Sequence, residues 1–240
     1  MVNKSIIEQM KEHTIIAKKE LYQWIKEEHP DYSEASYRWE IYRLVHSGII
    51  TKIDNDLFVK GSMRKYKYAY TSPLQEQLIE FFKKEYPKLD AVMYDSTILN
   101  EWLNHQLARN IVFVEADKYF TEMIFEKMRL TFPSSVLVNP KVDEFTRYIE
   151  QNSIVVQNLA TQAPRNKHSY EIKLEKLIVD LFTVPILRQL FSESEMVPML
   201  ESMFKEYVVE QKTMFAYAKR RKCDQKIRQF INQFTSIELR

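Results

Sequence analysis

The clearest pattern of hydrophobic and polar positions lies between residues 33 and 60. Its first half repeats apolar side chains at the spacing of one buried helix face, namely Tyr37, Ile41, Leu44 and Val45. Ser33 suits a helix start, because its hydroxyl can accept a hydrogen bond from an unpaired backbone N–H. Gly48 suits a helix end, because it adopts the left-handed conformation at little cost. The pattern therefore predicts a helix from Ser33 to Ser47.

A β-hairpin is predicted directly after this helix. Two short β-prone runs, 49–53 and 57–60, flank the turn-forming segment 54–56. Upstream, helical spacing predicts a supporting helix that stops before Pro30, because proline disfavours helix geometry in the residue before it. A short helix near residues 6–10 and a short strand at 14–16 come first. This order is that of a winged helix-turn-helix.

A winged helix-turn-helix makes double-stranded DNA the first partner to test. We expect the helix at 33–47 to enter a major groove, with these residues nearest the DNA: Ser33, Ser36, Arg38 and Arg43. Trp39 either stacks on a sugar or seals the junction with the next domain. Basic residues of the hairpin and the following tract are expected to contact phosphates: Lys52, Lys60, Arg64, Lys65 and Lys67. Alternatively, the module binds only protein and the basic tract is a solvated linker.

Composition limits the classes of protein that fit. The 240 residues are 45% hydrophobic, which is enough for roughly two domains with real cores. The net charge is only +2, but residues 1–70 and 205–240 are basic, with 12 and 9 Lys/Arg against 10 and 4 Asp/Glu. A single cysteine, Cys223, excludes an intrachain disulfide and disfavours structural zinc. Two glycines leave no glycine-rich phosphate loop, and the five histidines show no ligand spacing, so no cofactor or metal is predicted.

Nothing in the sequence indicates a membrane. The N-terminus lacks the apolar core of a signal peptide, and no apolar run approaches the length of a membrane span. We therefore expect a cytoplasmic protein without a membrane partner.

The rest of the chain first alternates between strand and helix patterns and then becomes helical. This predicts an α+β protein with a winged helix-turn-helix at 1–70, an α/β domain at 71–170, and a helical C-terminal subdomain at 171–240 that packs on it. In the middle domain we expect Ser96 to cap one helix and Asp117 to cap another at 118–130. The later helices are predicted at 172–182, 195–209, 211–220 and 224–234.

Several short motifs carry a resemblance to a known family. They are Val136-Leu137-Val138-Asn139-Pro140, then Glu175-Lys176-Leu177-Ile178-Val179-Asp180, and finally Tyr217-Ala218-Lys219-Arg220. Together with the N-terminal winged helix, this order resembles the AbiEi-type antitoxins of type IV toxin–antitoxin systems. The resemblance implies that the winged helix represses its own operon by binding inverted repeats in the promoter. It also implies that the C-terminal part counteracts a nucleotidyltransferase-like toxin encoded next door. The long aromatic middle departs from a compact family example.

The charged residues of these motifs also have structural explanations. Lys176 and Asp180 are spaced to form an ion pair on one helix, worth a few tenths of a kcal/mol. The basic run near the C-terminus is either a solvated helix end or a second phosphate contact: Lys219, Arg220, Arg221 and Lys222.

An enzyme is the third possibility, after the DNA-binding regulator and the protein-binding module. Acidic residues flank the predicted strands of the middle domain: Asp90, Asp95, Glu115 and Asp117. Metal-dependent nucleases use carboxylates at strand ends together with a lysine. Asp117 and Lys118 are adjacent, however, and would point to opposite faces of a strand. The sequence therefore favours a non-enzymatic protein.

Overall fold

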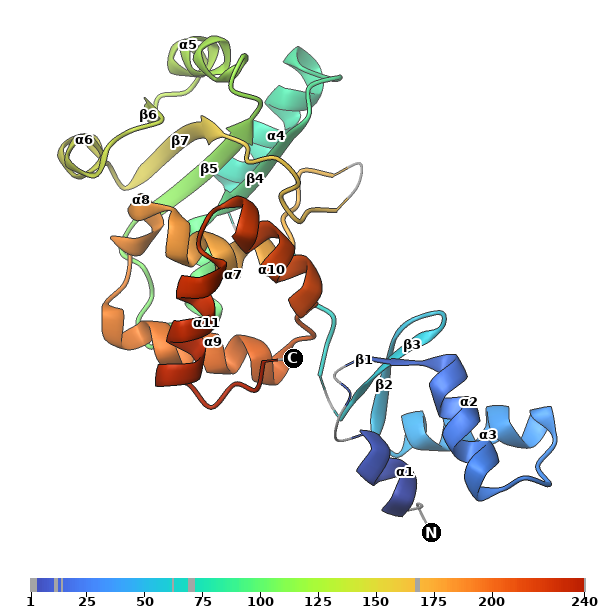
Figure 1. Cartoon of the computed structure of the whole chain (residues 1–240). Coiled ribbons are helices and arrows are strands. Elements are labelled where there is room, and N and C mark those ends of the chain that lie inside the picture. Colours follow the sequence, from blue (N-terminus) through green and yellow to red (C-terminus); the bar gives the residue numbers. More distant parts are fainter. Residues whose placement is uncertain are drawn as a thin grey trace. The chain divides into compact units, whose positions relative to one another are not determined.

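The computed structural model describes residues 4–10, 13, 15–61, 63–68, 72–166 and 169–239. The protein is a mixed α and β structure with two sheets, and it divides into two compact units (Figure 1). The first unit comprises Met1–Tyr66 and Phe204–Val208, and the second comprises Lys67–Met203 and Val209–Arg240. The segments 71–170 and 171–240 thus fall in one unit, apart from 204–208.

The described residues of the first unit form helices around a small antiparallel sheet. In chain order its elements are α1 (Lys4–Gln9), β1 (Ile15–Ala17), α2 (Lys18–Glu28), α3 (Glu34–His46), β2 (Ile50–Asp54) and β3 (Leu57–Lys60). The strands lie in the order β1-β3-β2. A shared core is formed by buried residues of every element, including Ile6, Ile16, Leu21, Leu44 and Phe58. The elements follow the predicted order, and predicted strand residue 14 lies outside the described residues.

Both ends of α3 use the residues that the sequence indicated. The Ser33 hydroxyl oxygen accepts a hydrogen bond from the Ser36 backbone N–H at 3.2 Å. At the other end Gly48 has a φ of 71°, and its N–H donates to the Val45 carbonyl at 3.1 Å. The Ile49 N–H donates to the Leu44 carbonyl, also at 3.1 Å. These two bonds form a Schellman motif, which satisfies carbonyls that the helix itself leaves free.

The second unit is built on one mixed sheet. Its elements are α4 (Pro73–Glu85), β4 (Ala91–Asp95), the 3-10 helix η2 (Ser96–Glu101), β5 (Asn110–Ala116), α5 (Thr121–Thr131), β6 (Ser135–Val138), α6 (Val142–Tyr148), β7 (Asn152–Asn158), α7 (Leu174–Thr183), α8 (Pro185–Arg188), α9 (Glu193–Glu206), α10 (Gln211–Arg220) and α11 (Asp224–Phe234). The strand order is β4-β5-β7-β6. Only the β4–β5 pair is antiparallel, whereas β5–β7 and β6–β7 are parallel.

Helices cover both faces of this sheet. On one face, α4 and α5 pack their apolar side chains against alternate strand residues such as Met93, Val114 and Val156. On the other face, α7 contacts Glu115 of β5 and Tyr94 of β4 through Lys176. Because both faces are covered, the strands read as continuous apolar runs.

Several predicted boundaries in the second unit need correction. Asp95 caps the helix at 96–101 in place of Ser96, its Oδ1 accepting the Thr97 N–H at 2.8 Å, and that helix is of the 3-10 type. Asp117 does not cap α5, since its Oδ1 accepts the Tyr119 N–H at 3.0 Å and the helix begins only at Thr121. The helices predicted at 172–182 and 195–209 are Leu174–Thr183 and Glu193–Glu206. Those predicted at 211–220 and 224–234 are confirmed.

Candidate functional site

The solvent-facing side of α3 carries a row of large side chains: Arg38, Trp39, Tyr42 and His46. Trp39 is 60% exposed and Tyr42 is 63% exposed. The His46 ring stacks on Tyr42 with ring centroids 5.6 Å apart and an interplanar angle of 12°. Spacings of three and four residues place these side chains on one helix face, opposite the buried Ile41 and Leu44. The helix therefore presents a largely aromatic surface to solvent.

Arg43 is held against this surface by a buried acid. Glu40 is only 3% exposed, and its Oε1 accepts a hydrogen bond from Nη2 of Arg43. The guanidinium carbon of Arg43 lies 5.6 Å from the centre of the Trp39 ring. A buried carboxylate needs a charged partner, so the pair is costly to break. Arg43 thus supports Trp39 from inside the row and is only partly free for a ligand.

The predicted residues at the start of α3 have different surroundings. The hydroxyls of Ser33 and Ser36 lie 3.0 Å apart and form part of the helix cap. The Arg38 side chain is 69% exposed and reaches Glu34, one turn away, with an N···O distance of 3.2 Å. Arg38 is therefore more accessible than Arg43, the other arginine of α3 predicted to lie near the DNA. Tyr42 and His46 were missed by the sequence prediction, although their position opposite the apolar stripe was a usable signal.

The residues predicted to contact phosphates are divided between the two units. Lys52 of β2, Lys60 of β3 and Lys65 are exposed in the first unit. Arg64 is also exposed, but its Nη2 lies 3.4 Å from a Glu206 carboxylate oxygen. Lys67 is exposed and belongs to the second unit.

The basic run at the C-terminus separates into surface and structural residues. Lys219, Arg220 and Lys222 are exposed around the end of α10. The Arg221 side chain is only 23% exposed, and its Nη1 donates hydrogen bonds to the Tyr217 hydroxyl at 3.0 Å and to Oδ1 of Asp180 at 3.4 Å. Arg221 therefore acts inside the fold, whereas its neighbours remain available to a polyanion.

A buried ion cluster joins the sheet of the second unit to its helices. Nζ of Lys176 on α7 donates to Oε1 of Glu115 on β5 at 2.8 Å and also to Oδ2 of Asp180. The Lys176 ammonium lies 5.0 Å from the centre of the Tyr94 ring. The side chains of Lys176 and Asp180 are 0% exposed and that of Glu115 is 2% exposed. The predicted pair of Lys176 and Asp180 is confirmed, but a value of a few tenths of a kcal/mol is wrong for a pair without solvent.

Burial and charge act in opposite directions on these groups. Burial alone would lower the pKa of Lys176, but the carboxylates of Asp180 and Glu115 outweigh it and raise that pKa. Burial raises the pKa of Glu115, and Lys176 opposes the rise only in part. Lys176 therefore stays charged and serves as the centre of the cluster.

Most of the chain matches the model of a known family. A family model described as "Family of unknown function (DUF6577)" matches residues 36–237. The chain belongs to the DUF6577 family. The match includes most of α3, the hairpin and the cluster residues of α7.

Other comparisons add little about this DUF6577 protein. No curated protein matches it. Among solved structures it is similar to the crystal structure of RV2827C protein from Mycobacterium tuberculosis, with 9% identity, a TM-score of 0.27, and coverage of 99% of this chain and 83% of that one.

The carboxylates that suggested a nuclease have separate partners in the DUF6577 chain. Glu115 binds Lys176, while Asp95 and Asp117 accept backbone N–H groups. No group of three or more His, Cys, Asp or Glu side chains within the described residues is placed to hold a metal ion.

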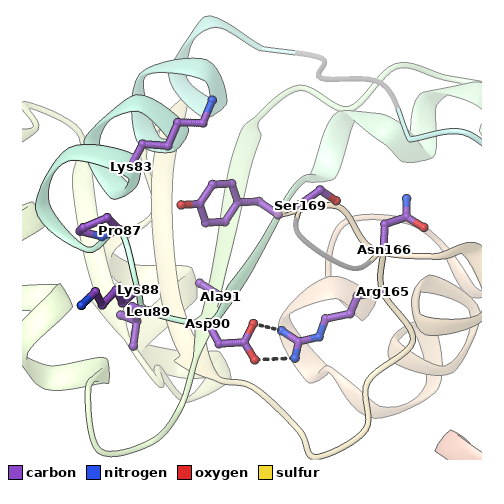
Figure 2. A pocket seen from close by; sticks show the side chains of 10 residues that line it. Lys83, Pro87, Lys88, Leu89, Asp90, Ala91, Arg165, Asn166 and Ser169 are labelled. Atoms are coloured by element: carbon purple, nitrogen blue, oxygen red, sulfur yellow. Dashed lines mark hydrogen bonds and ion pairs between the residues drawn. The ribbon is translucent and has the colours of Figure 1, made fainter.

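Asp90 lies in a surface pocket of the second unit with a volume of about 580 Å³ (Figure 2). Its two carboxylate oxygens are both bound by Arg165, one to Nη1 and one to Nη2. Figure 2 shows this pair at one side of the pocket, with Lys83 of α4 farther along the wall. The pair neutralises the one carboxylate among the described lining residues, so the pocket wall offers no free acid to a cation.

Within the described ranges of the DUF6577 chain, none of the helices combines the length and apolar character that a membrane span would require.

Proposed function

We propose that the first unit is a winged helix-turn-helix that binds duplex DNA, and that the protein is a sequence-specific transcriptional regulator. The observation that carries this proposal is the exposed row on α3, which is followed directly by a hairpin with exposed lysines. A helix of this kind fits a major groove, and the hairpin forms the wing beside it. Such a regulator must be in the same compartment as its DNA, which we expect to be the cytoplasm.

The side chains have different tasks in this proposal. Arg38 reads a base edge, because it is exposed and can pair with guanine in two places. Lys52 and Lys60 neutralise phosphates at the wing. Arg43 is a positioning residue that holds Trp39, because Glu40 occupies part of its guanidinium. Lys219, Arg220 and Lys222 form a second phosphate contact in the other unit.

The resemblance to AbiEi-type antitoxins extends the proposal to a biological role. In that role the protein represses its own promoter at inverted repeats and counteracts a nucleotidyltransferase-like toxin from the neighbouring gene. Expression of the neighbouring gene should arrest growth, and co-expression of this chain should restore it. A neighbour that is harmless, or whose toxicity this chain does not relieve, would reduce the proposal to a regulator alone.

A second candidate function is a module that binds protein through the same face. The exposed rings of Trp39 and Tyr42 favour it, because exposed aromatic residues are frequent anchors of protein interfaces. Salt dependence separates the two candidates. Phosphate binding weakens steeply as salt rises, whereas an aromatic protein interface responds little.

The deciding experiment measures binding of the full chain to its own promoter fragment by fluorescence anisotropy at two salt concentrations. Arg38→Ala should weaken binding by about 1–3 kcal/mol, the usual effect of losing one base-contacting arginine. Arg129→Ala is the matched control, because Arg129 is also an exposed helix arginine paired with a nearby glutamate, in the second unit. Equal affinity of the wild type and Arg38→Ala, or an affinity that does not change with salt concentration, would overturn the assignment.

A further inference from the structure

The centre of the exposed row on α3 is formed by two aromatic side chains. Trp39 and Tyr42 are each more than half exposed, at 60% and 63%. They are three residues apart and therefore neighbours on the helix surface. From this geometry we infer that α3 recognises the C5-methyl groups of thymines through Trp39 and Tyr42. The inference rests on the proposed binding of duplex DNA and names the bases that the helix prefers.

Both rings are supported from behind before any ligand arrives. Trp39 lies beside the Arg43 guanidinium, which Glu40 holds from the buried side of the helix. Tyr42 stacks on His46 with nearly parallel rings, 12° apart. Side chains that are already ordered lose less conformational entropy on binding. These contacts favour the observed arrangement of the two rings and lower that entropic cost.

The chemistry of this surface points to thymine. Adenine is usually read by Asn or Gln, and α3 (EASYRWEIYRLVH) contains neither residue. Arg38 suits guanine, which leaves the aromatic rings without a hydrogen-bonding base to read. In the major groove the one apolar group on a base edge is the thymine methyl. Flat apolar side chains gain from covering it, because the contact removes both surfaces from water.

The test removes the methyl groups and nothing else. The full chain first selects a duplex from a random library, and every thymine of that duplex is then replaced by uracil, which keeps the same hydrogen-bonding edge. Wild-type affinity should fall by about fourfold for each methyl group that is contacted, the factor expected for burial of one such group. Trp39→Ala and Tyr42→Ala should bind the thymine duplex more weakly and discriminate less between the two duplexes.

Tyr119→Ala provides the control variant. Tyr119 is 79% exposed in the second unit, so its loss should leave the thymine preference intact. Equal affinity of the wild type for the two duplexes would overturn the inference while leaving DNA binding in place. Failure to enrich any duplex would instead overturn the proposed function, and the inference with it. Unchanged discrimination in both Trp39→Ala and Tyr42→Ala would likewise reject the assignment of these rings.

Discussion

Nζ of Lys176 lies 2.8 Å from Oε1 of Glu115, and the two residues are 61 positions apart in the sequence. The pair is buried, and its network of hydrogen bonds extends through Asp180 to Tyr217 and Arg221. It therefore ties α7 and α10 to the central strand β5. Its neutral sum of charges, two carboxylates with one lysine and one arginine, explains how such polar groups remain in a core.

Loss of the central lysine should strongly destabilise the protein. Lys176→Met leaves the carboxylates of Glu115 and Asp180 without their shared partner in an environment that excludes water. Breaking a buried pair in this way typically costs about 3–5 kcal/mol. Urea unfolding measures the change, with the exposed Lys212→Met on the adjacent helix α10 as the control.

A combined variant separates charge from packing. Adding Glu115→Gln to Lys176→Met restores a neutral cluster, because Asp180 keeps its partner Arg221, and should recover part of the lost stability. A loss below about 1 kcal/mol for Lys176→Met alone, or no recovery in the combined variant, would contradict this account.

Glu175 should lower the stability as pH rises, and its replacement by glutamine should remove this dependence. Burial raises the pKa of Glu175 above its ordinary value near 4.5, although its Oε1 accepts the Glu210 N–H at 2.8 Å. The folded state therefore binds more protons than the unfolded state just above pH 4.5, so this group lowers the free energy of unfolding as pH rises. Glu175→Gln keeps an acceptor and should gain stability over the wild type as pH rises through that window.

Glu201 offers a control of opposite sign. Hydrogen bonds from the Ser236 N–H at 2.7 Å and its hydroxyl at 2.8 Å lower the pKa of Glu201. Its stabilisation is present above the ordinary pKa and is lost as pH falls, so Glu201→Gln should lose stability relative to the wild type as pH rises from acid. Urea unfolding between pH 4 and 7.5 checks both variants. Two differences that stay constant with pH would refute the argument.

Under the proposed function, Lys52 and Lys60 should control the salt dependence of DNA binding. Lys52 and Lys60 are exposed on the paired strands β2 and β3. Each phosphate contact that is lost should reduce the slope of log affinity against log salt by about 0.9. The double variant Lys52→Ala/Lys60→Ala is compared with Lys83→Ala/Lys84→Ala on α4, where both lysines are also exposed. Identical slopes for the two double variants would remove the wing from the interface.

The sequence predicted best where local rules decide the structure. The apolar spacing in α3 identified its buried face, and Ser33 and Gly48 act at its two ends as expected. The start at Ser96 was predicted less well, because Asp95 is an equally good cap one residue earlier and the following turn is of the 3-10 type. Local residue preferences alone do not choose between neighbouring caps.

Local rules could not predict the long-range contacts. Glu115 was noticed as an acid after a strand, but its partner Lys176 is distant in sequence, and helical spacing offered only Asp180. Similarly, the position of Arg43 on a polar face gave no sign that it pairs with a buried acid, Glu40, and lies beside Trp39. Burial of a charged side chain depends on packing between elements, which the period of one helix does not reveal.

Two helix ends with the same geometry should respond oppositely to substitution. Lys222 after α10 has a φ of 56°, and Gly48 after α3 has a φ of 71°. At both ends the bonds of a Schellman motif are present, since Lys222 N–H donates to Lys219 and Cys223 N–H donates to Ala218, at 3.1 and 3.0 Å. A left-handed backbone is strained in a residue with a Cβ but not in glycine. Lys222→Gly should therefore stabilise the protein by about 0.5–1 kcal/mol, whereas Gly48→Ala should destabilise it by about 1 kcal/mol.

The surroundings of Gly48 make this comparison clean. An added Cβ at Gly48 would meet nothing within 4 Å, so the cost there is conformational and involves no clash. Lys222→Ala serves as the charge control, because it removes the ammonium group and keeps the strained Cβ. Thermal and urea unfolding of the three variants should rank Lys222→Gly above the wild type, Lys222→Ala near it and Gly48→Ala below it. If Lys222→Ala stabilises as much as Lys222→Gly, relief of charge repulsion among the neighbouring cations, rather than backbone strain, determines the stability of this helix end.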